Sequence, residues 1–170
     1  MDEMEEDTLT YIFFILVSQA YYLLVCLLIG GLLGHTMAAL VFFLAFNILR
    51  RYAGGMHATT EYRCMAISTG LIVATMVRVH FLTRTWCKWF WVPVGVAAIL
   101  VFFLAPVESI EKPLSPKRRK QNRITSTVIA FVGFGAVLLL ENSAFRFPIG
   151  MAILDESVLL FFGKIREGKF

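Results

Sequence analysis

The sequence predicts an all-α membrane protein in which about six helices cross the bilayer, with both chain ends in the cytoplasm. Of the 170 residues, 58% are hydrophobic and 16% are charged, against roughly 45–50% and 25% in soluble domains. The apolar residues are concentrated in long runs, and a helix that spans the hydrocarbon core needs about 20 of them. Because backbone amides in lipid must be hydrogen-bonded within each segment, a helical bundle is the expected fold.

Six apolar runs account for the predicted spans of a single domain that covers residues 1–170. The spans are residues 11–32, 36–49, 64–79, 91–105, 124–140 and 149–163. Three polar segments separate some of these spans: an island at 50–64, an outer loop at 80–88 and a basic cytoplasmic loop at 106–123. The outer loop is rimmed by tryptophans, which favour the membrane–water interface.

The distribution of Lys and Arg predicts the orientation of the bundle. With the N-terminus in the cytoplasm and alternating spans, the other twelve of the 16 basic residues lie inside, and those outside are Arg78, Arg84, Lys88 and Arg146. The positive-inside rule favours this arrangement, which places the island at 50–64 on the cytoplasmic face. The net charge of +4 is therefore explained by topology and does not indicate a nucleic-acid partner.

The three cysteines and three histidines do not form a recognisable metal or disulfide framework. Cys26 lies in an apolar run, and we expect it to be a small buried thiol. His35 and His80 lie at predicted outer ends of spans, where we expect them to be interfacial residues with no nearby partner. The absence of an HExxH element argues against a metalloprotease. The sequence therefore predicts no metal site.

The polar island RRYAGGMHATTEYRC carries His57 and Cys64, seven residues apart. A thiol becomes a strong nucleophile when a histidine within hydrogen-bond reach takes its proton. In a straight helix this spacing separates the two Cα atoms by roughly 10.5 Å, which is too far for a direct bond. We therefore expect a bend at Gly54 and Gly55, with His57 on a loop or short helix and Cys64 at the start of the next helix. A pair completed between two subunits would also satisfy the distance.

Spacing alone leaves other interpretations of the island open. A histidine near a membrane interface is often only interfacial, and a cysteine in an apolar run often serves packing. Glu61 lies between His57 and Cys64 and is able to orient the imidazole as a third member. A salt bridge of Glu61 with Arg63 or Arg51 is at least as consistent with its position.

Two further groups of charges have both a structural and a functional interpretation. The basic run is typical of a topology signal, but it would also attract an acidic peptide or anionic lipid; it consists of Lys117, Arg118, Arg119 and Lys120. Asp155 and Glu156 lie inside the sixth predicted span, where charge is costly and indicates a function. We expect these two carboxylates to face the interior of the bundle.

Three blocks, in this order along the chain, resemble the accessory gene regulator B (AgrB) family of membrane cysteine endopeptidases in peptide quorum sensing. The first block is Arg50, Gly55, His57 and Cys64. The second is APVESIEKPLSPKRRK, residues 105–120, which is similar to the family's alanine-proline, lysine-proline and polybasic loop. The third and weaker block is LDESVLL, residues 154–160. The resemblance covers most of the chain.

This resemblance implies a bacterial membrane enzyme that cleaves the acidic C-terminal tail from a short AgrD-like pro-peptide. Cys64 would hold the peptide as a thioester, His57 would act as general base and then general acid, and Arg50 and Gly55 would have supporting roles. A cysteine or serine of the substrate would then close a thiolactone or lactone ring without any cofactor. The polybasic run and Glu156 become candidates for substrate binding, and a homodimer is expected. The alternative is a non-catalytic membrane transport or scaffold protein.

Overall fold

The computed structural model of this chain describes residues 3–55, 61–85, 88–107 and 115–166. Within these ranges the protein contains six α-helices and one short 3-10 helix, η1 (Lys88–Phe90), which confirms the predicted all-α class. The α-helices are α1 (Glu3–Leu32), α2 (Thr36–Ala53), α3 (Glu61–Thr85), α4 (Trp91–Leu104), α5 (Pro116–Leu139) and α6 (Ser143–Arg166).

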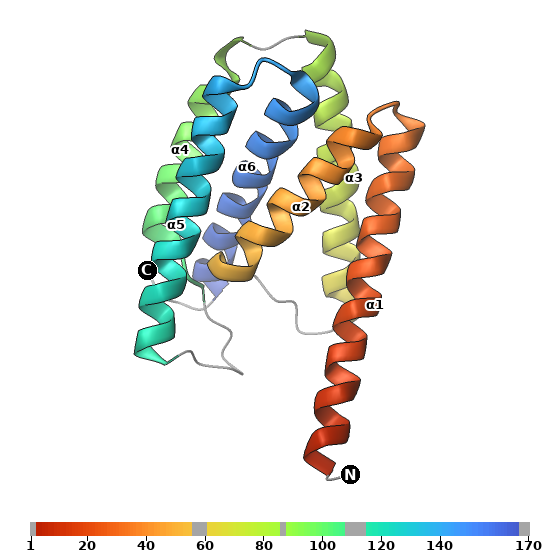
Figure 1. Cartoon of the computed structure of the whole chain (residues 1–170), viewed down its shortest axis with the longest axis vertical. Helices are drawn as coiled ribbons and strands as arrows, with labels where there is room; N and C mark the ends of the chain where they lie inside the picture. The colour runs from red at the N-terminus through yellow and green to blue at the C-terminus, as the bar shows by residue number, and fades with distance from the viewer. Residues whose placement is uncertain (1–2, 56–60, 86–87, 108–114, 167–170) are drawn as a thin grey trace.

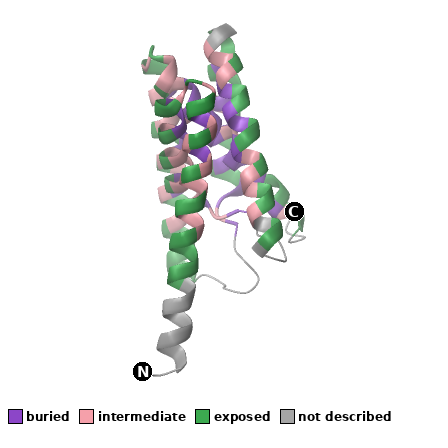
Figure 2. Cartoon of the chain, turned by 90° about the vertical axis from the view of Figure 1, so that its right-hand side faces the viewer, coloured by how far each residue is buried: buried purple, intermediate pink, exposed green. Residues whose placement is uncertain are grey.

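The helices are arranged around α6 (Figure 1). This helix contacts α2, α3, α4 and α5, whereas α1 packs on α2 and α3 at one side of the bundle. Twelve of the 24 residues of α6 are buried. Buried residues lie toward the inside of the bundle, whereas exposed residues cover its outside (Figure 2). The central helix therefore sets the relative positions of the helices around it.

The outer surface of the bundle is apolar, as a lipid-facing surface must be. Four helical segments are long and apolar enough to cross a membrane: Ile12–Leu32, Thr36–Ala53, Met65–Thr83 and Pro116–Leu139. Large hydrophobic side chains point outward, among them Phe13, Phe103 and Leu139, which would be unfavourable in water but is stable against lipid tails. This chain is therefore a membrane protein.

Two of the expected loops are partly helical. The expected outer loop at 80–88 is wrong in its first part, because α3 continues to Thr85. The expected basic loop at 106–123 is wrong in its second part, because α5 begins at Pro116. Ser115 caps this helix by accepting a hydrogen bond from the backbone N–H of Arg118 at 3.5 Å. A serine N-cap followed by proline at the first helical position is a strong start signal, and it places the basic run on the first turns of α5.

The last helix also begins earlier than the sixth predicted span, which covers residues 149–163. The side chain of Asn142 caps α6, since its Oδ1 accepts a hydrogen bond from the N–H of Ala144 at 2.9 Å. Pro148 lies inside the helix near its start and does not end it. Hydropathy marks only the apolar part of this helix, whereas the capping residue marks its first residue.

Candidate active site

The chain leaves α2 through two glycines, at the bend that the sequence predicts. The N–H of Gly54 donates to the carbonyl oxygen of Arg50 at 3.0 Å and closes the last turn of α2. Gly54 has φ +78° and Gly55 has φ +143°, and side chains of L residues disfavour both conformations. Glycine is therefore the residue that suits both positions, where the chain leaves the end of α2.

A short segment after α4 is joined to this bend. The N–H of Val107 donates to the carbonyl oxygen of Ala53 at 3.0 Å, and Gly54 and Val107 form an isolated parallel bridge. A Cβ atom on Gly54 would collide with the carbonyl oxygen of Val107. The close contact brings the alanine-proline element, Ala105–Pro106, to the start of the polar island, although more than 50 residues separate them in the sequence.

A buried ion pair lies directly beside the same bend. Nη1 of Arg50 is 3.6 Å from Oε2 of Glu156, whose side chain is fully buried in α6. A Cβ atom on Gly55 would lie 2.9 Å from Nη1 of Arg50 and 3.6 Å from Oε1 of Glu156, so the backbone of Gly55 packs against the pair. The guanidinium of Arg50 also lies over the ring of Phe46, at 5.7 Å from its centroid. Arg50, Gly55 and Glu156 thus form one cluster between α2 and α6.

The burial of Glu156 bears on its role in the site. A side chain with no exposed surface is well placed to hold Arg50 and the backbone at Gly55. Among the described residues, no hydrogen-bond donor reaches Oε1 or Oε2. The pair with Arg50 is therefore the main compensation for the buried charge, because a buried charge is stable only when it is paired.

The candidate catalytic residues follow Arg50 and Gly55 in the sequence. Cys64 lies in the first turn of α3, which begins at Glu61, as expected for a cysteine at the start of a helix. His57 lies outside the described residues, and so do the side chains of Cys64 and Glu61. The structure thus describes the island up to Gly55 and again from the start of α3.

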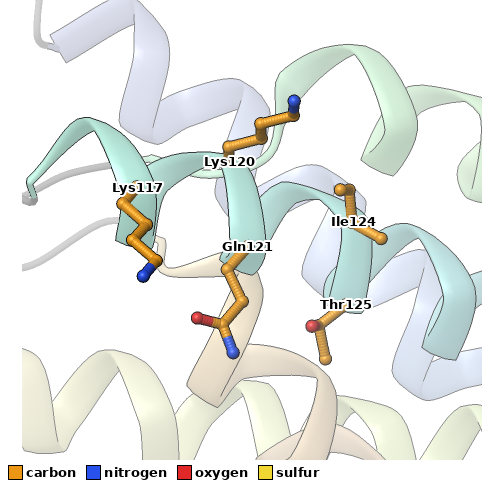
Figure 3. A pocket seen from close by; sticks show the side chains of 5 residues that line it. All are labelled: Lys117, Lys120, Gln121, Ile124 and Thr125. Carbon is orange, nitrogen blue, oxygen red and sulfur yellow. The ribbon is translucent and has the colours of Figure 1, made fainter.

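The polybasic run is divided between different faces of α5. Lys117 and Lys120 line a pocket of about 350 Å³ together with Gln121, Ile124 and Thr125 (Figure 3). Arg118 and Arg119 are exposed but do not line it. This pocket lies at the N-terminal end of α5, at the same end of the bundle as the C-terminal end of α2 (Figure 1).

Two further polar clusters lie farther along the bundle. Asp155 is buried and accepts hydrogen bonds from Arg78 and Thr75 of α3. Nε2 of His35 lies 3.1 Å from Nδ1 of His80, so the expectation that these histidines have no partner is wrong. Both histidines lie at the same predicted side of the membrane, and this was the one sequence signal that could have paired them.

No group of three or more His, Cys, Asp and Glu side chains in the described part of the chain is arranged to hold a metal ion. The polar groups that the structure does bring together are carboxylates with arginines, a threonine hydroxyl, and a pair of imidazoles. Such pairs position helices and bind peptides or anions, and they do not resemble a metal centre.

Comparison with known proteins shows the family of this chain. The family profile of accessory gene regulator B matches residues 1–162. The chain is 27% identical to accessory gene regulator protein B of Staphylococcus aureus (strain MW2), over 81% of this chain and 73% of the relative. It is 23% identical to an AgrB-like protein of Clostridium perfringens (strain SM101 / Type A), over 83% of this chain and 71% of the relative. No solved structure matches the chain. The chain belongs to the accessory gene regulator B family.

Proposed function

We propose that this protein is a membrane cysteine endopeptidase that removes the C-terminal tail of an AgrD-like pro-peptide and releases a cyclic precursor of a quorum-sensing signal. One observation carries the proposal: segments from the three blocks that resemble the family meet beside the island. Gly54, the neighbour of Gly55 in the first block, bridges to Val107 of the second, and Arg50 of the first pairs with Glu156 of the third. Distant segments that converge on one loop are typical of a functional site on a rigid scaffold.

The reaction uses His57 and Cys64 alone as catalytic residues. His57 takes the proton from the thiol of Cys64, and the sulfur attacks the carbonyl carbon of the peptide bond before the acidic tail. The carbon–nitrogen bond breaks, and the imidazolium of His57 gives its proton to the amine of the leaving tail. The peptide is then held on Cys64 as a thioester. No atom is oxidised or reduced, so the step requires no cofactor.

Ring closure follows from the same thioester. A thiol or hydroxyl within the bound peptide attacks the thioester carbon, and its proton passes through His57 to the sulfur of Cys64. The enzyme is regenerated and the peptide leaves as a thiolactone or lactone. Water would compete with this intramolecular attack, and a membrane-flanked site with little water favours ring closure over hydrolysis.

Arg50, Gly55 and Glu156 support the catalytic residues without touching the substrate. The ion pair is packed against the backbone of Gly55, two residues before His57, and it ties the end of α2 to the central helix. Glu61, at the first residue of α3, is a candidate for orienting the imidazole of His57. This cluster fixes the direction in which the chain enters the island.

The face of α5 that carries Lys117 and Lys120 is the proposed docking place for the acidic tail. Its pocket is lined by Lys117, Lys120 and the apolar side chain of Ile124, and basic beside apolar residues suit a peptide that has both acidic and apolar residues. An amphipathic leader would lie on the inner leaflet, where the positive-inside rule places the island. We also propose that the active form is a homodimer surrounded by lipid.

Cleavage of the pro-peptide in reconstituted vesicles tests the proposal. We expect wild-type protein and Cys26→Ala to release the tail, and Cys64→Ala and His57→Ala to release none. Cys26 is a suitable control because its thiol is buried in α1 and bonds to the carbonyl oxygen of Ala39. Tail release by Cys64→Ala would contradict the mechanism. Absence of cleavage by folded wild-type protein with its pro-peptide would favour the non-catalytic alternative.

A further inference from the structure

Asp155 forms a second polar tie, on a different face of α6 from the Glu156 pair. Its side chain is 3% exposed, and its Oδ1 accepts a hydrogen bond from Nη2 of Arg78 at 2.9 Å. Its Oδ2 accepts the hydroxyl of Thr75, and Nη2 of Arg78 also donates to the oxygen of that hydroxyl at 3.1 Å. The three side chains form a closed triangle in which Asp155 and Thr75 are buried and the side chain of Arg78 is 46% exposed. Charge-assisted bonds of this kind are about twice as strong as neutral ones.

Asp155 and Glu156 bind different helices because neighbouring residues on an α-helix point about 100° apart. Glu156 pairs with Arg50 of α2, and Asp155 pairs with Thr75 and Arg78 of α3. The helix α2 leads into the island, and α3 begins within it and carries Cys64. Two consecutive carboxylates on the central helix therefore hold both helices that flank the proposed catalytic residues.

The tie at Asp155 is important for α3 because this helix has few buried apolar residues. Among its described side chains, the buried hydrophobic ones are Ile72, Met76 and Val79, whereas Val73 and Val77 are exposed. All three buried residues lie in the same part of the helix as Thr75 and Arg78. The buried side chains of α3 thus lie along one short stretch beside the tie at Asp155, and nearer the N-terminal end of α3 the hydroxyl oxygen of Tyr21 of α1 lies 3.3 Å from that of Thr69.

We propose that Asp155 is a positioning residue that sets the tilt of α3 and thereby the place of Cys64. The proposal rests on the proposed catalytic role of Cys64. Thr75 follows Cys64 by eleven residues, which corresponds to about 16 Å along the helix axis. A tilt of roughly 3.5° at Thr75 moves the Cys64 end by about 1 Å, and a misplacement of about 1 Å is able to reduce a rate about 100-fold.

Activity measurements test the positioning role first. We expect Asp155→Asn to lower kcat about 10- to 100-fold with little change in KM, because the substrate-binding face on α5 is untouched. Thr75→Val removes only the hydroxyl and should lower kcat in the same direction, while Thr75→Ser should restore it. Ser157→Ala is the matched control, since Ser157 is buried on α6 and, among the described residues, its hydroxyl donates only to the carbonyl oxygen of Leu154 in the same helix. Wild-type kcat in both Asp155→Asn and Thr75→Val would overturn the proposal.

A distance measurement tests the same idea without catalysis. Spin labels at Arg51→Cys and Tyr62→Cys, in protein whose three native cysteines are replaced, report the separation of α2 and α3 next to the island. Both sites are exposed. We expect Asp155→Asn or Thr75→Val to shift or broaden the distance distribution and Ser157→Ala to leave it unchanged. Identical distance distributions in all variants would overturn the positioning role of Asp155 even if kcat falls. Activity of Cys64→Ala would instead overturn the proposed function and leave the distance result valid.

Discussion

Replacing Arg50 and replacing Glu156, the two partners of the buried ion pair, should lower the free energy of unfolding by different amounts. The side chain of Arg50 is 23% exposed, whereas that of Glu156 is fully buried. Breaking a buried pair by removing one partner costs about 3 to 5 kcal/mol, because the remaining charge is left without compensation. Arg50→Met leaves a carboxylate with no water contact, so we expect a loss near the upper value. Glu156→Gln leaves a guanidinium that still reaches solvent, so we expect a loss near the lower value.

The double variant distinguishes this explanation from a general loss of packing. With Arg50→Met and Glu156→Gln combined, neither position of this pair carries a charge, and we expect the protein to be more stable than with Arg50→Met alone. Equilibrium unfolding in mixed micelles measures the four free energies of unfolding. Arg51→Met is the matched control, because Arg51 is the exposed neighbour and should change stability by no more than about 0.5 kcal/mol. Equal losses in the two single variants and an additive double variant would refute the reasoning.

Two further predictions concern the bend and the basic face of α5. Gly54→Ala should lower the free energy of unfolding by about 1 to 3 kcal/mol. The alanine would be strained at φ +78°, and its Cβ atom would collide with the carbonyl oxygen of Val107. Gly70 has open space around it, so Gly70→Ala should be neutral or slightly stabilising in the same unfolding assay. Lys117→Gln combined with Lys120→Gln should raise KM for the pro-peptide several-fold and weaken its dependence on salt. Replacing Arg118 and Arg119 by glutamine should raise KM less than replacing the two lysines. An equal rise in KM for the two double variants would contradict docking of the pro-peptide in the pocket.

The helices could be predicted because their signals are local. Apolar runs of sufficient length and the Gly54–Gly55 pair mark the first helices and the bend between α2 and α3. The start of α5 was missed because hydropathy hides a polar first turn, although Ser115 and Pro116 are a helix start signal. Caps are therefore better guides than hydropathy to where a helix of a membrane protein begins.

The contacts between distant residues could be predicted only in part. The sequence indicates that Arg50 needs a charge partner and that Glu156 needs compensation, but 106 positions separate them and no local pattern joins them. The bridge between Gly54 and Val107 could not be predicted from the sequence either, because it depends on how α2 and the end of α4 pack together. The pair of His35 and His80 was misread for the same reason. Tertiary contacts of this kind follow from helix packing, which composition does not specify.

The most direct test of the central claim is to trap the thioester on Cys64. A pro-peptide whose ring-closing cysteine is replaced by alanine should be cleaved once and remain attached to the enzyme. We expect intact mass spectrometry to show an adduct equal to the peptide without its tail and without water, located on Cys64, released by hydroxylamine and absent from His57→Ala. Release of the tail by wild-type protein without any such adduct, or the same adduct on Cys64→Ala, would contradict the account.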